Sequence, residues 1–427
     1  MKLGFVGLGK LGACCAAVLA QSHDVIGIDT NAETIAAINA RKPPSANKEP
    51  QLEELLKPGH LEATTDYAKL NGCEIIFIIV PTPSTEDNTF THKYVDRVLG
   101  SIYIEMKTWP NRLHPLPIVI VSTLTPGSMW HLQRDCMSWL GDRAGEVELV
   151  YSPVFVALGQ VVHDFCYPDA LLVGTNNGLS SPNIDMLVRI YRNSVFIPSV
   201  EVHLMTWVEA EMAKLFLNVM LSVKSLYANE LALLSGSVCA DASRILSFVG
   251  ADKRIGPKMM SPGFPPGGTC LPRDIRCIST LARRYFTRDN LFGTIEHIAE
   301  TQMDEIISEI VFDLDDPVGV CGLGYKPGTP VREEASATAV IARLKEMGLT
   351  VYVHDFMIPA ETPEQIASLG ELAERVDSLV LCTMDKGYAR TFTPEMLSGK
   401  IVYDIWGLLS PEQIIACRHY ERFGNWR

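Results

Sequence analysis

A glycine-rich turn with the same layout occurs twice in this chain of 427 residues. Near the N-terminus, an apolar run leads into Gly7–Gly12, and the next apolar run ends at Asp29. In the last third, an apolar run leads into Gly322–Gly324, and a later one ends at Asp355. A strand, a glycine turn and a helix in this order open a βαβ unit of a parallel sheet. The chain is therefore predicted to contain two α/β domains.

The first turn, Gly7–Gly12, fits the G-x-G-x-x-G pattern of dinucleotide-binding sites. The first glycine forms the tight turn, Gly9 admits the pyrophosphate, and the third glycine packs helix against strand. Asp29 is placed to bind a ribose 2′-hydroxyl and would repel a 2′-phosphate, which favours NAD over NADP. An ordinary glycine-rich βα turn is the alternative. The predicted cofactor-binding residues here are Gly7, Gly9, Lys10, Leu11, Gly12 and Asp29.

Two proline-containing loops follow later apolar strands, at Val80–Pro83 and Ser122–Ser128. Ligands in open α/β sheets bind outside the carboxyl ends of the strands. Pro81, Thr82 and Thr123 are therefore predicted to contribute to the cofactor site, with the two hydroxyls reaching cofactor or substrate. Turns that merely end a strand are the alternative for each loop.

The composition excludes several classes of protein. A net charge of −13 argues against non-specific binding to nucleic acid or to an anionic membrane. We find no signal peptide and no apolar run long enough to span a bilayer. The eleven cysteines lack framework spacing, which suggests reduced thiols in a cytoplasmic protein. No Cys/His cluster has metal-ligand spacing, so no metal is predicted.

Strands and crossover helices alternate in both outer thirds. A long helix is predicted for Ser199–Ser235, which contains neither proline nor glycine. Its apolar faces are expected to pack against a second subunit, giving a homodimer. The predicted strands are Lys2–Gly7, Asp24–Asp29, Glu74–Pro81, Ile118–Ser122, Glu148–Ser152, Val318–Gly322, Thr350–Asp355, Ser378–Thr383 and Lys400–Asp404.

The predicted fold class is α/β, with two Rossmann-like doubly wound domains joined by a central helical domain with a long spine helix. We expect an NAD-binding domain at residues 1–198, a helical dimerisation domain at 199–305 that carries the cysteine loop, and a second Rossmann-like domain at 306–427.

The stretch Gly267–Asp274 carries the strongest chemical signal. Its two glycines permit close backbone approach to a ligand. Cys270 comes after them and lies four residues before the carboxylate of Asp274. A thiolate attacks an aldehyde readily, and a nicotinamide can then remove hydride from the adduct. Cys270 is therefore a candidate for covalent redox catalysis.

Three polar residues share one face of the predicted long helix: Glu211, Lys214 and Asn218. Lys214 and Asn218 interrupt an otherwise apolar face, where buried polar groups need partners. A substrate oxyanion would suit both side chains. The alternative is a solvated stripe on a long helix.

Together these motifs resemble the UDP-glucose/GDP-mannose dehydrogenase family over essentially the whole chain. The resemblance implies NAD-dependent oxidation of a nucleotide sugar's C6 alcohol to a carboxylate in two hydride transfers, serving polysaccharide precursor synthesis. It also implies an NAD domain, a helical dimer core and a nucleotide-binding domain. The motifs are Gly7–Gly12, Asp29, Val80–Pro83, Ser122–Ser128, Glu209–Asn218, Arg254–Gly256, Gly267–Asp274 and Gly322–Glu334.

The resemblance also implies roles for individual residues. Cys270 would trap the aldehyde as a thiohemiacetal that is oxidised to a thioester. Lys214 would stabilise the oxyanion, with Asn218 as its partner. Asp274 would organise water and general-base chemistry, held by Thr123. The residues implied to bind substrate are Lys214, Asn218, Arg254, Phe264, Gly267, Gly268, Lys326 and Arg332, with Arg254 serving either its own or a neighbouring subunit's site.

The chain departs from the family pattern at four places. Val154 stands where the family has a glutamate, and Leu158 replaces a second common acid. General-base help contributes about 10²–10⁴ in rate, so thioester hydrolysis is expected to be slow or altered. Trp406 stands near a usual arginine, so the preferred substrate is expected to differ from UDP-glucose. The arginine that the family usually has around Asp169–Leu172 is also missing, and the sequence does not explain this difference.

Two other functions are compatible with parts of the sequence. A β-hydroxyacid or 6-phosphogluconate-type dehydrogenase also pairs a Rossmann domain with helices, but it needs neither Cys270 nor a third domain. A non-catalytic relative that binds NAD or a nucleotide sugar would explain the missing acids. Retention of Thr123, Lys214, Asn218, Cys270 and Asp274 argues against that second alternative.

Overall fold

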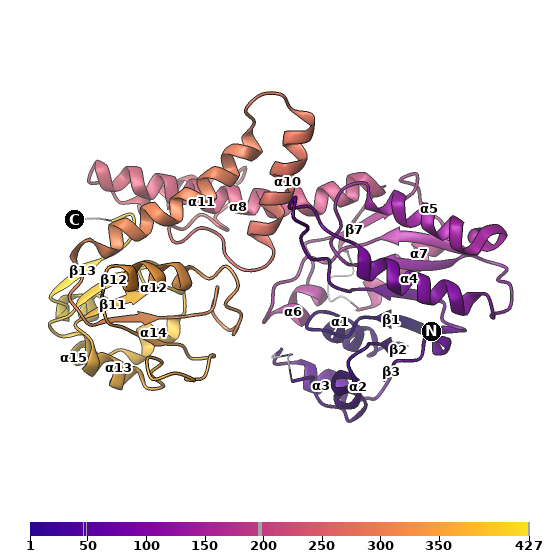
Figure 1. The fold of residues 1–427 in the computed structure, drawn as a ribbon, viewed down its shortest axis with the longest axis horizontal. Coiled ribbons are helices and arrows are strands. Elements are labelled where there is room, and N and C mark those ends of the chain that lie inside the picture. The colour runs from indigo at the N-terminus through magenta and orange to yellow at the C-terminus, as the bar shows by residue number, and fades with distance from the viewer. Residues whose placement is uncertain (46, 48, 195–198, 426–427) are drawn as a thin grey trace. The chain divides into compact units, whose positions relative to one another are not determined.

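A computed structural model describes all residues except 46, 48, 195–198, 426 and 427. The chain forms two compact units, Met1–Lys214 (unit 1) and Leu215–Arg427 (unit 2) (Figure 1). Each unit contains a β-sheet with helices on both faces, as the two glycine turns predicted.

Unit 1 contains an eight-stranded sheet in the order β3-β2-β1-β4-β5-β6-β7-β8. Neighbouring strands are parallel except β6 and β7. The order reverses between β1 and β4, which is the switch point where ligands bind in doubly wound sheets. The strands are β1 Lys2–Val6, β2 Asp24–Ile28, β3 Leu61–Thr64, β4 Ile75–Ile78, β5 Leu116–Ile120, β6 Val147–Tyr151, β7 Ala170–Thr175 and β8 Glu201–Thr206.

Helices cover both faces of this sheet. One buried core joins α1, α2, α3, α6 and α7 to the sheet, and the other joins α4 and α5 to its opposite face. Alternate side chains of each strand serve the two cores, as in β1, where Phe5 and Val6 belong to different ones. The helices are α1 Gly12–Leu19, α2 Ala32–Asn39, α3 Leu52–Leu56, α4 Lys93–Met106, α5 Ser128–Leu140, α6 Val161–Cys166 and α7 Pro182–Ser194.

The predicted long helix begins later than its composition indicated. Residues 201–206 form β8, which pairs in parallel with the whole of β7, and helix α8 spans Trp207–Ser237. The Glu209 carboxylate accepts hydrogen bonds from the Thr206 amide at 2.8 Å and hydroxyl at 2.7 Å, which caps the helix start. The prediction of helix for 199–206 was therefore wrong. The spine helix itself is confirmed.

Unit 2 contains a five-stranded parallel sheet in the order β10-β9-β11-β12-β13. Helices α11 and α12 pack on one face, and α13, α14 and α15 pack on the other. The strands are β9 Val318–Cys321, β10 Val351–His354, β11 Ser378–Leu381, β12 Ile401–Asp404 and β13 His419–Glu421. The helices after α8 are α9 Ala242–Ala251, α10 Leu271–Tyr285, α11 Leu291–Ile310, α12 Ser336–Glu346, α13 Leu369–Arg375, α14 Lys386–Thr391, α15 Pro394–Leu397 and α16 Pro411–Ala416.

The glycine turns of the two sheets have the same strained backbone. Gly7 has φ +95° and Gly322 has φ +92°, a region that residues with a Cβ rarely adopt. A Cβ at Gly7 would lie 2.1 Å from the carbonyl oxygen of Ile79. A Cβ at Gly322 would lie 2.2 Å from the hydroxyl of Thr383. Both positions therefore require glycine.

Substitutions at Gly12 and Gly9 test this packing. A Cβ at Gly12 would lie 1.9 Å from the Gly7 carbonyl oxygen, whereas a Cβ at Gly9 would meet nothing within 4 Å. Gly12→Ala is expected to lower the free energy of unfolding by about 1–3 kcal/mol through overpacking. Gly9→Ala should change it by less than about 0.5 kcal/mol. Urea unfolding of both variants measures the difference, and equal stability would contradict the close packing.

Candidate active site

The first glycine turn leaves its middle residue open. An added Cβ at Gly9 meets nothing within 4 Å, so the backbone there is accessible. The Asp29 carboxylate accepts hydrogen bonds from the Leu8 amide at 2.7 Å and the Asn31 amide at 2.8 Å. These bonds hold the carboxylate beside the turn, where the pattern places a ribose. Lys10 is exposed in the turn, and Leu11 is the N-cap residue of α1. The geometry fits NAD.

The loops after β4 and β5 are tied together at their bases. The Thr82 hydroxyl donates to the Thr123 carbonyl at 2.7 Å. The Val80 amide donates to the Ser122 hydroxyl at 2.9 Å, and that hydroxyl donates to the Val80 carbonyl at 2.8 Å. Thr82 is buried and Pro81 is exposed, so Thr82 holds the loops while Pro81 faces outward. Sequence reasoning treated both threonines as ligands and missed this linking role of Thr82.

Lys214 is buried beside a backbone carbonyl and an aromatic ring. Only 8% of the residue is exposed. Its Nζ donates to the Val154 carbonyl at 2.8 Å and lies 4.3 Å from the centre of the Phe155 ring. Glu211 is also buried, at 0% exposure, so this part of α8 is not a solvated stripe. A buried ammonium can stabilise an oxyanion strongly because little water screens it.

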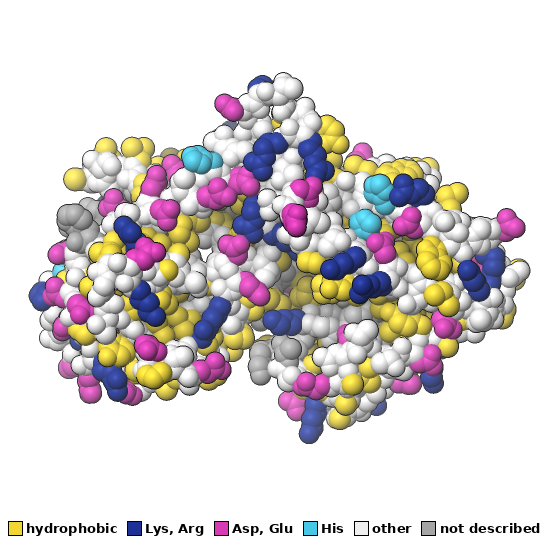
Figure 2. All heavy atoms as spheres, in the orientation of Figure 1, with side chains coloured by type: hydrophobic (Ala, Val, Ile, Leu, Met, Phe, Trp, Pro, Cys, Tyr) yellow, Lys and Arg dark blue, Asp and Glu magenta, His cyan; other side chains and the backbone are white. Residues whose placement is uncertain are grey.

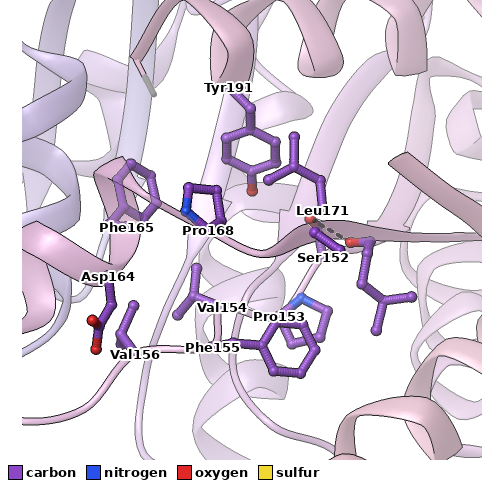
Figure 3. A pocket seen from close by; sticks show the side chains of 12 residues that line it. Ser152, Pro153, Val154, Phe155, Val156, Asp164, Phe165, Pro168, Leu171 and Tyr191 are labelled. Carbon is purple, nitrogen blue, oxygen red and sulfur yellow. Dashed lines mark hydrogen bonds between the residues drawn. The ribbon is translucent and has the colours of Figure 1, made fainter. Parts of the chain in front are cut away.

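Val154 provides its backbone to Lys214 and its side chain to an apolar wall. Figure 3 shows it beneath Pro168 on the wall of a small cavity of about 30 Å³. Val154 and Leu158 both pack against the hydrophobic core. Asp164 also lines the cavity, and its carboxylate accepts a hydrogen bond from the Ala157 amide at 2.9 Å. The two positions at which the resemblance expects acids are thus part of apolar packing.

In unit 2, Cys270 lies exposed at the start of α10. The space beside the two preceding glycines is filled by the chain itself, because a Cβ at Gly268 would lie 2.5 Å from the Tyr325 ring. A Cβ at Gly267 would lie 2.3 Å from the Glu334 carbonyl oxygen. The glycines therefore let this loop pack on the segment 325–334. Burial, and then the nearby Cys270, raises the pKa of Tyr325 to about 12.

The structure joins Asn218 to Asp274. The Asn218 amide donates to the Asp274 carboxylate at 2.6 Å, and Asp274 is 1% exposed. The other carboxylate oxygen lies 3.5 Å from Nε of Arg273. The Asp274 backbone amide donates to the Cys270 carbonyl at 2.9 Å, so the two residues are one helical turn apart. Unit 2 therefore presents an exposed thiol next to a buried, hydrogen-bonded carboxylate.

Trp406 occupies the space beneath the loop that precedes Cys270. Its ring lies 2.1 Å from a Cβ built at Gly263, and its centre is 6.4 Å from that of the buried Phe264. The indole N–H donates to the Cys382 carbonyl at 3.1 Å. Trp406 is thus packed within unit 2. Phe264 belongs to the same core.

The predicted basic residues of unit 2 occupy different settings. Arg254 is exposed and forms paired hydrogen bonds to Asp252, at 3.0 and 2.6 Å. Lys326 Nζ lies 5.8 Å from the centre of the Tyr325 ring. Arg332 lines a cavity of about 440 Å³ with Pro265. The cavity also contains the acids Glu296, Glu300 and Glu334, and it is lined by Arg276.

The described residues contain neither a metal-ligand cluster nor a membrane-spanning helix. No group of three His, Cys, Asp or Glu side chains there could hold a metal ion. Over the same residues, every helix is too short or too polar to cross a membrane. Figure 2 shows acidic and basic side chains interspersed on the visible face of both units.

Comparisons with known proteins cover the chain in three consecutive parts. Models of the UDP-glucose/GDP-mannose dehydrogenase family match with the NAD binding domain at residues 1–195, the central domain at 208–301 and the UDP binding domain at 319–411. The chain is 28% identical to GDP-mannose 6-dehydrogenase of Pseudomonas putida, covering 96% of this chain and 97% of the relative. It is 25% identical to the putative UDP-glucose 6-dehydrogenase YtcA of Bacillus subtilis, covering 98% of each.

Solved structures show the same fold. A UDP-glucose dehydrogenase from Pyrobaculum islandicum matches with a TM-score of 0.85 and 25% identity, covering 100% of this chain and 98% of the other. A UDP-D-ManNAc dehydrogenase from Pyrococcus horikoshii matches with a TM-score of 0.83 and 22% identity, covering 100% of both. The three family models together span most of the chain, and NAD is its cofactor. The chain belongs to the UDP-glucose/GDP-mannose dehydrogenase family.

Proposed function

We propose that this protein oxidises the C6 alcohol of a nucleotide sugar to a carboxylate, through a thioester at Cys270, and releases the product slowly. The observation that carries the proposal is the exposed Cys270 thiol at the start of α10, one turn before the buried Asp274. Its relatives include enzymes named for GDP-mannose and for UDP-glucose, which support a nucleotide sugar without selecting one. The division into domains at 1–198, 199–305 and 306–427 is part of the proposal.

NAD, when bound, supplies the hydride acceptor for both oxidations. Lys214 stabilises negative charge on the substrate oxygen, as its buried ammonium permits. The C6 alcohol first loses a hydride and its hydroxyl proton, which gives the aldehyde. The Cys270 sulfur then bonds to the aldehyde carbon while the thiol proton passes to the carbonyl oxygen. The resulting thiohemiacetal loses a second hydride and its hydroxyl proton and becomes a thioester. Water then adds to the thioester carbon, the C–S bond breaks, and the thiol and the carboxylate form.

Release depends on a group that takes a proton from water. Val154 and Leu158 offer no such group, and both lie in apolar packing. Asp274, with Thr123 as its proposed partner, remains for this task, but its carboxylate already accepts a bond from Asn218. The missing help is worth about 10²–10⁴ in rate, which makes hydrolysis the slow step.

The second proposal concerns assembly as a homodimer through α8 and α9. Met220, Tyr227 and Leu234 are exposed at heptad spacing along α8. Phe248, on α9, is 82% exposed. Large apolar side chains grouped in this way on the surface of unit 2 are typical of a buried interface.

The covalent step can be observed directly. Wild-type protein mixed with NAD and either GDP-mannose or UDP-glucose should give a burst of two NADH per subunit, followed by slow turnover. Intact mass spectrometry should then show a nucleotide-sugar acyl adduct that accumulates because its hydrolysis is slow. Cys270→Ala should abolish the adduct and the two-step oxidation. Cys239→Ala is the matched control, because Cys239 is also an exposed thiol.

The two halves of this proposal fail separately. Two NADH per sugar at rapid steady turnover, with no adduct, would rule out slow release. Full two-step oxidation by Cys270→Ala would rule out the covalent role. NAD binding without NADH from any nucleotide sugar would favour the non-catalytic alternative.

Charge on the proposed interface should separate the subunits. Leu234→Glu combined with Phe248→Glu is expected to yield monomers, because each buried side chain of this size contributes about 1.5–3 kcal/mol and a buried charge adds a penalty. Ile104→Glu, at an apolar position on α4 that is 53% exposed, should leave the mass unchanged. Light scattering after size exclusion measures the mass. A monomeric wild-type protein would refute the dimer.

A further inference from the structure

Glu211 is a fully buried carboxylate that contacts the start of another helix. It lies on α8 with 0% exposure. Its Oε2 accepts a hydrogen bond from the Gly127 amide at 2.6 Å, and its Oε1 accepts one from the Met129 amide at 2.8 Å. Both donors belong to the first turn of α5, more than 80 residues earlier in the chain. Both carboxylate oxygens are therefore engaged by backbone.

The start of α5 needs this external partner. The first amides of a helix have no acceptor within the helix, and an N-cap side chain usually supplies one. The N-cap of α5 is Gly127, with φ +96° and no side chain. A negative charge at this end is also favoured by the helix dipole. Glu211 thus supplies the cap that the local sequence lacks.

The capped turn is continuous with the loop that carries Thr123. Within this loop, the Ser128 hydroxyl donates to the Thr125 carbonyl at 2.7 Å. The Thr125 hydroxyl accepts a bond from the Phe90 amide at 2.8 Å, and the Thr123 carbonyl accepts one from Thr82. A displacement of the first turn of α5 would therefore be transmitted to Thr123.

We propose that Glu211 is a positioning residue that fixes the Thr123 loop relative to Lys214. Lys214 lies one turn after Glu211 on α8. The inference rests on the roles proposed for Thr123 and Lys214. Glu211 acts by holding the first turn of α5 to the helix that carries the oxyanion-stabilising lysine.

The ionisation of Glu211 offers a readout. Burial raises its pKa to about 7, against the lowering effects of the Met129 and Gly127 amides and of the nearby His92. His92 itself bonds to Asp96 at 2.8 Å and stacks on His131 of α5, and Asp135 also acts on it. Protonated Glu211 would set an O–H against an amide N–H and lose one of its two bonds.

The sign of the pH dependence follows from the raised pKa. Between about 4.5 and 7 the folded state binds more protons than the unfolded state, so the free energy of unfolding falls as pH rises. The anchor, in contrast, needs the carboxylate and is complete only above about pH 7. As pH rises and Glu211 ionises, the activity that depends on Thr123 should therefore increase while the free energy of unfolding decreases.

Glu211→Gln tests the proposal, with Glu209→Gln as the matched control. Glu209 lies on the same helix, but it is exposed and bonds only to Thr206 in the described contacts. Amide hydrogen exchange over residues 123–129 is compared at pH 8 and pH 6. Wild type and the control should be better protected at pH 8, relative to the intrinsic rates. Glu211→Gln should show low protection that is the same at both values, because its NH₂ faces an N–H donor.

Kinetics give the second readout. Glu211→Gln should lower the rate of product release about tenfold or more at pH 8, the effect of losing a hydrogen bond to a charged group. In the wild type, the rate of product release should fall between pH 8 and pH 6. In Glu211→Gln this fall should be absent, while the KM for the nucleotide sugar changes little. Thermal unfolding confirms that the variant is folded.

Each result decides the proposal. Unchanged protection of residues 123–129 in Glu211→Gln would overturn the anchor, as would lost protection with a wild-type rate and pH profile. If wild-type protein forms no adduct, the proposed function fails, and hydrogen exchange still determines whether Glu211 holds the loop. A rate loss in Glu209→Gln equal to that in Glu211→Gln would also overturn the assignment.

Discussion

A carboxylate bonded to a glycine turn sets the geometry of each sheet. Asp29 accepts a hydrogen bond from the Leu8 amide at 2.7 Å, and Asp355 accepts one from the Leu323 amide at 2.7 Å. The same bond has different consequences in the two units. Gly9 of the first turn is open, whereas a Cβ at Gly324 would lie 2.5 Å from the Thr329 carbonyl oxygen. The repeated motif therefore gives an accessible turn for NAD only in unit 1.

Much of the fold follows from local patterns in the sequence, and the missing parts depend on tertiary pairing. Buried strands such as β1 and β4 are apolar runs that end in glycine or proline, and they were predicted. Strand β8 was predicted as helix because proline and glycine are absent from it. Its pairing with β7 and the Thr206–Glu209 cap decide where α8 begins. Neither interaction is visible in the composition.

The candidate site shows the same division. Cys270 and Asp274 were found because they lie in one short motif. The glycines before them also let Tyr325 and the Glu334 carbonyl pack closely against the loop, from more than 50 residues away, and the motif does not reveal that contact. Glu211 was noticed only as part of a helix face. Its partners lie on α5, and a single sequence contains no signal for that contact.

The replacement of an acid by Val154 affects the two halves of the proposed reaction differently. Lys214 is held by the backbone carbonyl of Val154, which any residue at this position provides. Stabilisation of the oxyanion is therefore insensitive to the side chain. Proton removal from water does depend on the side chain at this position, because the step needs a side chain that accepts a proton. Asp274 is buried and already bonded to Asn218, so part of its accepting capacity is in use. Capture of the substrate can thus persist while hydrolysis becomes limiting.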